Sequence, residues 1–210
     1  MASDPFTLAL RSEGQLREIY GAADPTAWRK DVGRLDDMCA RLIAASRMVF
    51  IASFSAEGRC DVTPRGGAAG FVTVLEEKRL AIPDATGNRR IDTLRNVVAT
   101  GQAGLVFLVA GRSWTLRING RACVVAEPAF LESLVAVGKP PRTAVVVEAE
   151  EVYAHCPKAF VRSELWEPET WLAPDDLPSP AEVARAHLGG SLTVEDIERR
   201  QQESLRHRLE

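Results

Sequence analysis

The sequence predicts a mainly β (α+β) protein that forms one domain, or one domain with a helical appendage. Six or seven short apolar segments are separated by turn residues, and these short connections favour antiparallel pairing. Only two helical segments interrupt the strands, so the strand–helix alternation of a βαβ fold is missing. With 210 residues, 46% of them hydrophobic, the chain can enclose a proper core. These observations favour a small closed barrel over a parallel sheet.

Composition narrows the possible functions. The formal net charge is −3, which argues against general nucleic-acid binding because that requires a basic chain or face. No apolar run approaches the roughly 18 residues of a membrane span, and no signal-peptide segment opens the sequence, so we expect a cytoplasmic protein without membrane contact. The 4 cysteines include no C-x-x-C pair and there are only 3 histidines, which argues against a structural zinc site. We expect the cysteines to be reduced and mostly buried.

Residues 1–46 are expected to form a helical segment that packs on the β core. The stretch 13–20 is amphipathic and ends before a glycine, and Asp24-Pro25-Thr26 restarts a helical turn that carries Trp28. A third helix is predicted over about 34–46 because apolar residues recur there at helical spacing. Its apolar face contains Leu35, Met38, Cys39, Leu42 and Ile43.

Apolar segments bounded by turn residues predict the strands of a barrel domain, 47–166. Ala56-Glu57-Gly58 forms the first hairpin turn, and Pro64 places the second strand at a sheet edge or at that strand's end. A glycine-rich loop, 66–70, precedes the second hairpin. The predicted strands span residues 48–54, 60–65, 71–75, 79–82, 103–110, 114–126 and 144–154. The two inserted helices are expected over 89–100 and 128–137.

The tail, 167–210, is expected to lie outside the barrel. Just before it, Pro157 suits the first position of a helix whose apolar stripe includes Phe160 and Trp166. Residues 167–180 are rich in proline and acidic residues and predict an extended linker. Two terminal helices are expected over about 180–188 and 193–208, the second capped by Thr193 and Asp196.

The stretch 81–96 is the first candidate for chemistry. Pro83-Asp84 and Gly87-Asn88 are turn residues, and the helix after them is expected to begin with Arg89 and Arg90. Cations at a helix N-terminus oppose the helix dipole, whereas an anion there is favoured. This arrangement suits a phosphate monoester held among the arginines, although a solvated basic turn explains the stretch alone equally well.

Motifs of several common enzyme classes are absent. The sequence contains neither a P-loop nor a G-x-G-x-x-G fingerprint, and the G-x-S-x-G elbow of many hydrolases is missing. His155 and Cys156 are adjacent on an extended segment, so their side chains point to opposite faces. A Cys/His catalytic pair is therefore disfavoured.

Basic residues on two predicted strands give a second group of candidates. Thr63 and Arg65 share a face because side chains alternate along a strand. On the longer strand Thr115, Arg117 and Asn119 share a face, opposite Trp114, Leu116 and Ile118. Solvent exposure alone would explain the polar face of either strand. Together with the two adjacent arginines and Lys158, they could hold a phosphate through charge-assisted bonds, with Trp166 beside a planar ring.

Several motifs, in one order, resemble those of a known family. These motifs lie at 58–66, 70–72, 80–84, 87–96, 115–122 and 155–166. The chain resembles, over about 17–166, the pyridoxamine 5′-phosphate oxidase-like family of FMN-binding split barrels, and more narrowly its bacterial subfamily described as pyridoxamine 5′-phosphate oxidase-related, FMN-binding. The sequence departs from the pattern of this subfamily in two places. Residues 66–70 lack the Asp and Pro that usually follow the Arg-Gly pair, and Thr63 stands where the subfamily usually has a Ser.

The resemblance implies a six-stranded antiparallel split β-barrel with flanking helices and a helical C-terminal tail. It also implies a homodimer with FMN bound in clefts at the interface. The strand 61–66 would run beside the flavin ring and ribityl chain, and the 88–90 loop would bind the phosphate. Arg117 would face the site, and the C-terminal block would contribute across the dimer. The implied cofactor-binding residues are Thr63, Pro64, Arg65, Gly66, Asn88, Arg89, Arg90, Arg117, Lys158 and Trp166.

The resulting hypothesis is an FMN-dependent oxidoreductase that acts on an unidentified small molecule. Arg65, Arg117 or a backbone N–H could stabilise the reduced ring, and no residue is assigned as general acid or base. The alternatives are a non-catalytic flavin-binding or redox-sensing protein and a phosphorylated-ligand binding module without flavin. Slow or absent turnover despite tight FMN binding would favour the non-catalytic protein. A colourless protein that cannot be reconstituted with FMN would favour the binding module without flavin.

Overall fold

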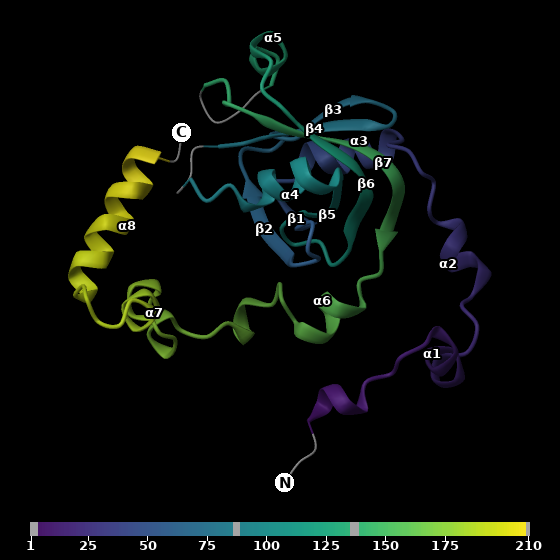
Figure 1. The fold of residues 1–210 in the computed structure, drawn as a ribbon, viewed down its shortest axis with the longest axis horizontal. Helices are drawn as coiled ribbons and strands as arrows, with labels where there is room; N and C mark the ends of the chain where they lie inside the picture. Colours follow the sequence, from purple (N-terminus) through teal and green to yellow (C-terminus); the bar gives the residue numbers. More distant parts are fainter. Residues whose placement is uncertain (1–3, 86–88, 135–138, 209–210) are drawn as a thin grey trace.

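The structure is one antiparallel sheet of 7 strands, in the order β2-β1-β5-β6-β7-β4-β3 (Figure 1). The computed structural model describes residues 4–85, 89–134 and 139–208. The strands are β1 (Met48–Phe54), β2 (Cys60–Gly66), β3 (Thr73–Glu76), β4 (Arg79–Pro83), β5 (Gln102–Leu108), β6 (Thr115–Val125) and β7 (Ala144–His155). Within residues 4–85, 89–134 and 139–208, no helix is both long and apolar enough to cross a membrane.

The sheet does not close on itself. β2 and β3 form its two edges, and within the described ranges they do not pair with each other. The expectation of a closed barrel is therefore wrong, whereas the antiparallel split barrel is confirmed with 7 strands in place of six. The additional strand, β3, has 4 residues and pairs only with β4, so it extends one edge without bridging the gap to β2.

The core lies inside the curved sheet, where alternate side chains of neighbouring strands meet. Val49 and Ile51 of β1 pair with Phe107 and Leu105 of β5, and all four are at most 1% exposed. Two helices contribute to the same core: Ile43 comes from α3 (Asp37–Ala45) and Val97 from α4 (Asp92–Thr100). Burial of this kind contributes roughly 1.5–3 kcal/mol for each large side chain.

Asp36 caps α3, and α3 covers β3. The Asp36 carboxylate accepts a 2.9 Å hydrogen bond from the Cys39 backbone N–H, which lowers the pKa of this carboxyl. Burial raises the pKa of the Cys39 thiol to about 11, so this thiol stays protonated at neutral pH. Met38, expected on the apolar face, is 63% exposed because it follows the cap on the outer side of the helix.

The helix expected over 89–100 begins three residues later than predicted, at Asp92. Its N-cap, Ile91, makes no side-chain hydrogen bond, and the helix ends where Gly101 adopts a left-handed conformation with φ 66°. Thr93 and Val97, one turn apart, face the core, whereas Ile91 and Val98 are exposed. The two arginines therefore precede α4 and do not occupy its first turn.

A bulge marks the pairing of the two longest strands. Asn119 pairs with Glu151 and Gly120 with Ala149, so Glu150 is the extra residue on β7. A Cβ at Gly120 would lie 2.0 Å from the Glu148 carbonyl oxygen, and only glycine fits there. On the outer face nearby, Glu148 forms ion pairs with Arg79 and Arg121, and these lower the pKa of its carboxyl.

Both ends of the chain extend away from the sheet (Figure 1). The N-terminal elements are a 3-10 helix (Pro5–Leu8), α1 (Glu13–Tyr20) and α2 (Pro25–Arg29). Val152 of β7 anchors this segment, since its N–H donates to the Asp31 carboxylate at 2.8 Å and its carbonyl accepts from Val32. Ile19 and Trp28 stay exposed.

The C-terminal part is a chain of short elements. After α5 (Pro128–Glu132) and β7 come α6 (Lys158–Ser163), 3-10 turns at Pro168–Thr170 and Pro174–Asp176, α7 (Pro180–His187) and α8 (Val194–Arg208). The expected cap of the last helix is present, because the Asp196 N–H donates to the Thr193 hydroxyl at 3.1 Å. α7 packs on α8, which buries Ala181 and Ile197.

The prediction of mostly buried cysteines is wrong. All four are free thiols, and only Cys39 is half-buried. Cys60 and Cys123 lie on outward-facing positions of β2 and β6, and Cys156 follows the end of β7.

Candidate functional site

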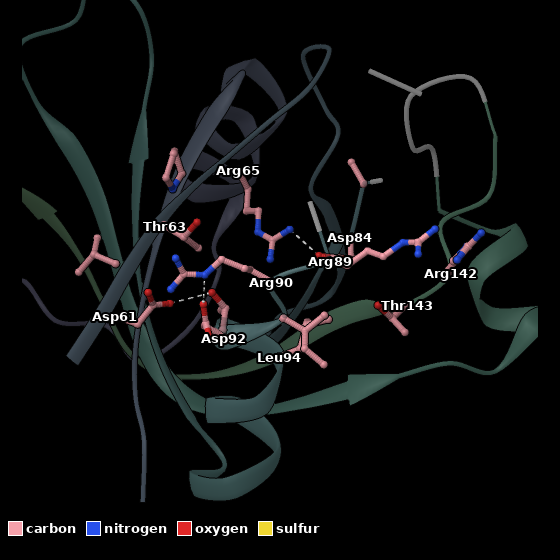
Figure 2. A pocket seen from close by; sticks show the side chains of 15 residues that line it. Asp61, Thr63, Arg65, Asp84, Arg89, Arg90, Asp92, Leu94, Arg142 and Thr143 are labelled. Carbon is pink, nitrogen blue, oxygen red and sulfur yellow. Dashed lines mark hydrogen bonds and ion pairs between the residues drawn. The ribbon is translucent and has the colours of Figure 1, made fainter. Parts of the chain in front are cut away.

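A pocket of about 630 Å³ lies where β2, the end of β4, the start of β7 and the start of α4 meet (Figure 2). Its lining is largely polar. The lining residues are Asp61, Val62, Thr63, Pro64, Arg65, Asp84, Ala85, Arg89, Arg90, Ile91, Asp92, Thr93, Leu94, Arg142 and Thr143. Four arginines and three aspartates are among them, and so the pocket is rich in charge of both signs.

Strand geometry brings these residues together from distant parts of the sequence. On β2, Asp61, Thr63 and Arg65 alternate with more exposed neighbours and therefore share the pocket side. On the other wall, Pro83 pairs with Ala144, and the next residues are joined by a 2.9 Å hydrogen bond from the Asp84 N–H to the Thr143 carbonyl. This ladder places the start of β7 directly beside the end of β4.

Two of the arginines are held by carboxylates. Arg65 forms an ion pair with Asp84, and both side chains are largely buried, at 23% and 22% exposure. Arg90 pairs with Asp92 at 2.9 Å, at the start of α4 (Figure 2). The third aspartate, Asp61, accepts a 2.9 Å hydrogen bond from the Thr93 hydroxyl, which ties β2 to α4.

The Arg65 guanidinium retains one unused donor. Its Nε is buried and has no hydrogen-bond partner in the described part of the chain. Leaving a buried donor unsatisfied costs about 1–3 kcal/mol, so such a group in a pocket is suited to an acceptor on a bound ligand.

Arg89 and Arg142 differ from the first two arginines. Neither forms an ion pair or hydrogen bond with a residue in the described ranges, and both are exposed. Arg89 has a φ of 65°, in the left-handed region that non-glycine residues seldom occupy. Figure 2 shows both side chains extending beyond Asp84, on the side of the pocket away from Asp61.

Half of the residues predicted for the site line this pocket: Thr63, Pro64, Arg65, Arg89 and Arg90. Gly66 ends β2 beside it, opposite Met48. Asn88 lies outside the described residues.

The remaining three predicted residues lie elsewhere on the same chain. Arg117 is on the outer face of β6, with its guanidinium 5.2 Å from the Tyr153 ring centroid. Lys158 is exposed at the start of α6. The Trp166 indole N–H donates to the Arg112 carbonyl at 2.9 Å, and its ring stacks on Phe160.

The polar face predicted for β6 needs one correction. Arg117 and Asn119 are half-buried on the outer face, but Thr115 is only 3% exposed, at the point where β6 begins. Trp114, expected on the inner side, precedes the strand and is 42% exposed.

Six further charged or hydroxyl-bearing residues of the pocket, Asp92 among them, were not among the predicted site residues. The other five are Asp61, Asp84, Thr93, Arg142 and Thr143. Asp61 could have been found, because it alternates with Thr63 and Arg65 on one strand. Arg142 carries no local signal, since only the pairing of β4 with β7 brings it to the pocket.

Comparison with known proteins gives a family. The family model described as pyridoxamine 5′-phosphate oxidase matches residues 35–156, more than half of the chain. No curated protein matches the sequence.

The solved structures to which the chain is similar are distant from it in sequence. A Lactobacillus delbrueckii protein, provisionally assigned as a pyridoxamine 5′-phosphate oxidase, is 21% identical, with a TM-score of 0.46 over 59% of this chain and 98% of that one. HupZ of Group A Streptococcus is 17% identical, with a TM-score of 0.44, and the match covers 56% of this chain and 90% of HupZ. A pyridoxamine 5′-phosphate oxidase-related, FMN binding protein of Nostoc punctiforme is 11% identical, with a TM-score of 0.39. The match covers 55% of this chain and 77% of that protein.

Proposed function

The chain belongs to the pyridoxamine 5′-phosphate oxidase family, and from this premise we propose that it binds FMN in the pocket between β2, β4, β7 and α4. We further propose that it is an FMN-dependent oxidoreductase acting on a small molecule. The observation that carries the proposal is the pocket's set of donors, above all the buried and unpartnered Nε of Arg65.

The residues present fit a phosphorylated flavin. Four arginines can supply charge-assisted hydrogen bonds to a phosphate, which are about twice as strong as neutral ones. Thr63 and Arg65 lie side by side on β2, where a ribityl chain and the polar edge of a planar ring could accept their hydrogen bonds. A volume of about 630 Å³ is within the range of small-molecule sites.

In this assignment the flavin, when bound, supplies hydride or electron transfer, and the protein supplies position and charge. Asp84 holds the Arg65 guanidinium in place at the wall of the pocket. The hydrogen bond from Thr93 to Asp61 fixes the start of α4 against β2 and keeps that wall of the pocket rigid.

We also propose that the protein is a homodimer with the flavin at the interface. The outer side of β1 and β2 is apolar and exposed, with Met48 at 41%, Phe54 at 43% and Val62 at 64%. A face of this kind on a soluble domain is typical of a protein–protein contact. In such a dimer Arg117, Lys158 and Trp166 would reach the pocket of the second subunit.

One observation favours a second candidate, a non-catalytic flavin-binding or redox-sensing protein. Among the described lining residues there is no His, Cys, Lys or Tyr, and each of the three aspartates already has a partner. A general acid or base would then have to come from the second subunit or from the substrate.

The test begins with the purified protein. We expect it to be yellow, to release FMN identified by mass, and to elute as a dimer in size-exclusion chromatography. If the protein neither retains FMN nor binds added FMN, the proposed function is refuted. If it binds FMN tightly but shows no turnover with reduced nicotinamides, pyridoxamine 5′-phosphate or oxygen, the non-catalytic candidate is favoured.

A further inference from the structure

We propose that the C-terminal arm, residues 158–208, pairs with the same arm of a second copy of this chain. The pairing sets the acidic segment of one arm, 164–176, against the basic end of α8, 199–206, in the other arm. It goes beyond the function proposed above, because it involves neither the pocket nor a flavin. It also adds to the proposed dimer a contact that the outer side of β1 and β2 does not include.

The arm is built from well-defined elements but has almost no core of its own. Ser179 and Glu182 form a capping box at the start of α7, with each side chain accepting a hydrogen bond from the other residue's backbone N–H. α7 and α8 pack on each other, yet among their described residues only Ala181 and Ile197 are buried. Helices of 8 and 15 residues are marginal in water without tertiary packing. The two helices therefore need a further surface to pack against.

Apolar side chains along the arm are held in place but left uncovered. The Trp171 indole N–H donates to the Leu165 carbonyl at 3.1 Å, which orients the ring, and this residue is 60% exposed. Leu172, Leu188 and Leu205 are each more than half exposed as well. Large aromatic side chains are frequent centres of protein–protein contacts. The surface along the arm is therefore suited to a protein partner.

The charges of the arm are separated along its length. The acidic segment contains no Lys or Arg and has a net charge of −5, whereas residues 199–206 of α8 have a net charge of +2. In the described part of the chain, the carboxylates of the acidic segment form no ion pair or hydrogen bond, and neither do the guanidinium groups of Arg200 and Arg206. Each region thus lacks a partner of opposite charge. The acidic residues are Glu164, Glu167, Glu169, Asp175 and Asp176.

Within one chain these two regions lie apart. Figure 1 shows α8 leading away from α7 and from the segment that follows α6. A two-fold dimer removes the separation, because in such a contact the first region of one copy meets the second region of the other, and the reverse holds as well. Two arms placed antiparallel across the axis bring both acidic segments against both basic ends. This complementarity identifies the partner as a second copy of the chain.

The test uses two charge-reversed variants of the full chain. Variant A carries Glu167→Lys, Glu169→Lys, Asp175→Lys and Asp176→Lys. Variant B carries Arg200→Glu and Arg206→Glu. The acidic segment then has a net charge of +3 in A, and residues 199–206 have one of −2 in B. A homodimer of either variant places like charges together, whereas a heterodimer of A and B restores opposite charges at both contacts.

The dimer dissociation constant is measured by analytical ultracentrifugation at low and at high salt. We expect A alone and B alone to raise this constant by about tenfold or more, because like charges then face each other twice. An equimolar mixture of A and B should return to within about threefold of the wild-type constant. High salt should weaken the wild-type dimer and reduce these differences, since salt screens exposed charges.

Three further variants complete the design. Trp171→Ala alters no charge and should raise the constant by about tenfold at either salt concentration. Arg41→Glu and Glu132→Lys are the controls, because both residues are exposed on α3 and α5, outside the arm. Each control should stay within about threefold of the wild type. Circular dichroism checks that A and B fold; if either does not, Trp171→Ala decides, and an unchanged constant would overturn the pairing.

The outcomes distinguish the arm pairing from the proposed function. If mixing restores the wild-type constant, the arms pair between copies, and a failure to bind FMN would then refute only the proposed function. If A and B dimerise as tightly as the wild type, the arm pairing is overturned, while a dimer through β1 and β2 is still tested by Ala52→Glu. If A and B are weakened and mixing restores neither, the charges do not act between copies and the pairing is overturned. A monomeric wild type would overturn it as well.

Discussion

Replacing Arg65 by lysine should have opposite effects on the stability of the ligand-free protein and on its affinity for FMN. Lysine keeps the positive charge and can still pair with Asp84, but it has no group equivalent to Nε. In the ligand-free protein that Nε is buried without a partner. Its removal therefore eliminates an unsatisfied donor, whose cost is about 1–3 kcal/mol.

The ligand should reverse the sign of this effect. When an acceptor on FMN satisfies Nε, the bond is one to a charged group and contributes about 1.5–3 kcal/mol. We therefore expect Arg65→Lys to weaken FMN binding by roughly 10–150-fold. The ligand-free variant should meanwhile unfold at the same denaturant concentration as the wild type or at a higher one.

Fluorescence titration with FMN and urea unfolding of the ligand-free protein measure the two quantities. Arg41→Lys, an equally conservative change at an exposed position of α3, should alter neither. Unchanged FMN affinity in Arg65→Lys would show that Nε does not contact the flavin. A loss of more than about 1 kcal/mol in the ligand-free state would show that Nε is already satisfied in solution, and the reasoning would fail.

Three further predictions concern the scaffold. Gly120→Ala should lower the free energy of unfolding, measured with denaturant, by about 3 kcal/mol or more, because the new Cβ would lie 2.0 Å from the Glu148 carbonyl oxygen. The control, Gly14→Ala in α1, should leave stability unchanged or raise it slightly. The ion pairs of Glu148 depress the pKa of its carboxyl below the ordinary 4.5. The contribution of this carboxylate to stability is therefore complete above pH 4.5 and is lost as the pH falls below that value. Glu148→Gln should make thermal stability less sensitive to acidification over that range, and an unchanged pH profile would contradict the ion-pair assignment. Ala52→Glu, in the middle of the exposed outer side of β1, should convert a dimer to monomers in size-exclusion chromatography, and a persistent dimer would place the interface elsewhere.

Local patterns predicted most elements of the sheet because each strand carries its own alternation and turn residues. The predicted ends agree with the observed ones for β1 and differ from them by at most two residues for β5, β6 and β7. The start of α4 was harder to locate. Its arginines are compatible with a helix by composition, but the left-handed φ of Arg89 interrupts the helix before Asp92.

The candidate site was predictable where one strand or one loop carries it. Thr63 and Arg65 were found because they alternate on β2, and Arg89 and Arg90 because they follow a turn. Arg142 could not be found in this way, since its place depends on the pairing of strands about sixty residues apart. The same limit applies to Asp84, whose partner is distant in sequence.

The two open edges of the sheet have a consequence for how the protein behaves at high concentration. An unpaired edge strand can add a strand from another molecule, which is a common start of aggregation. β2 carries Pro64, which has no N–H to donate, and it bears charged Asp61 and Arg65. β3 is only 4 residues long and ends in Glu76, whose carboxylate is paired with Arg79. Both edges thus present poor templates for additional strands, so the split in the barrel can remain open without promoting fibre formation.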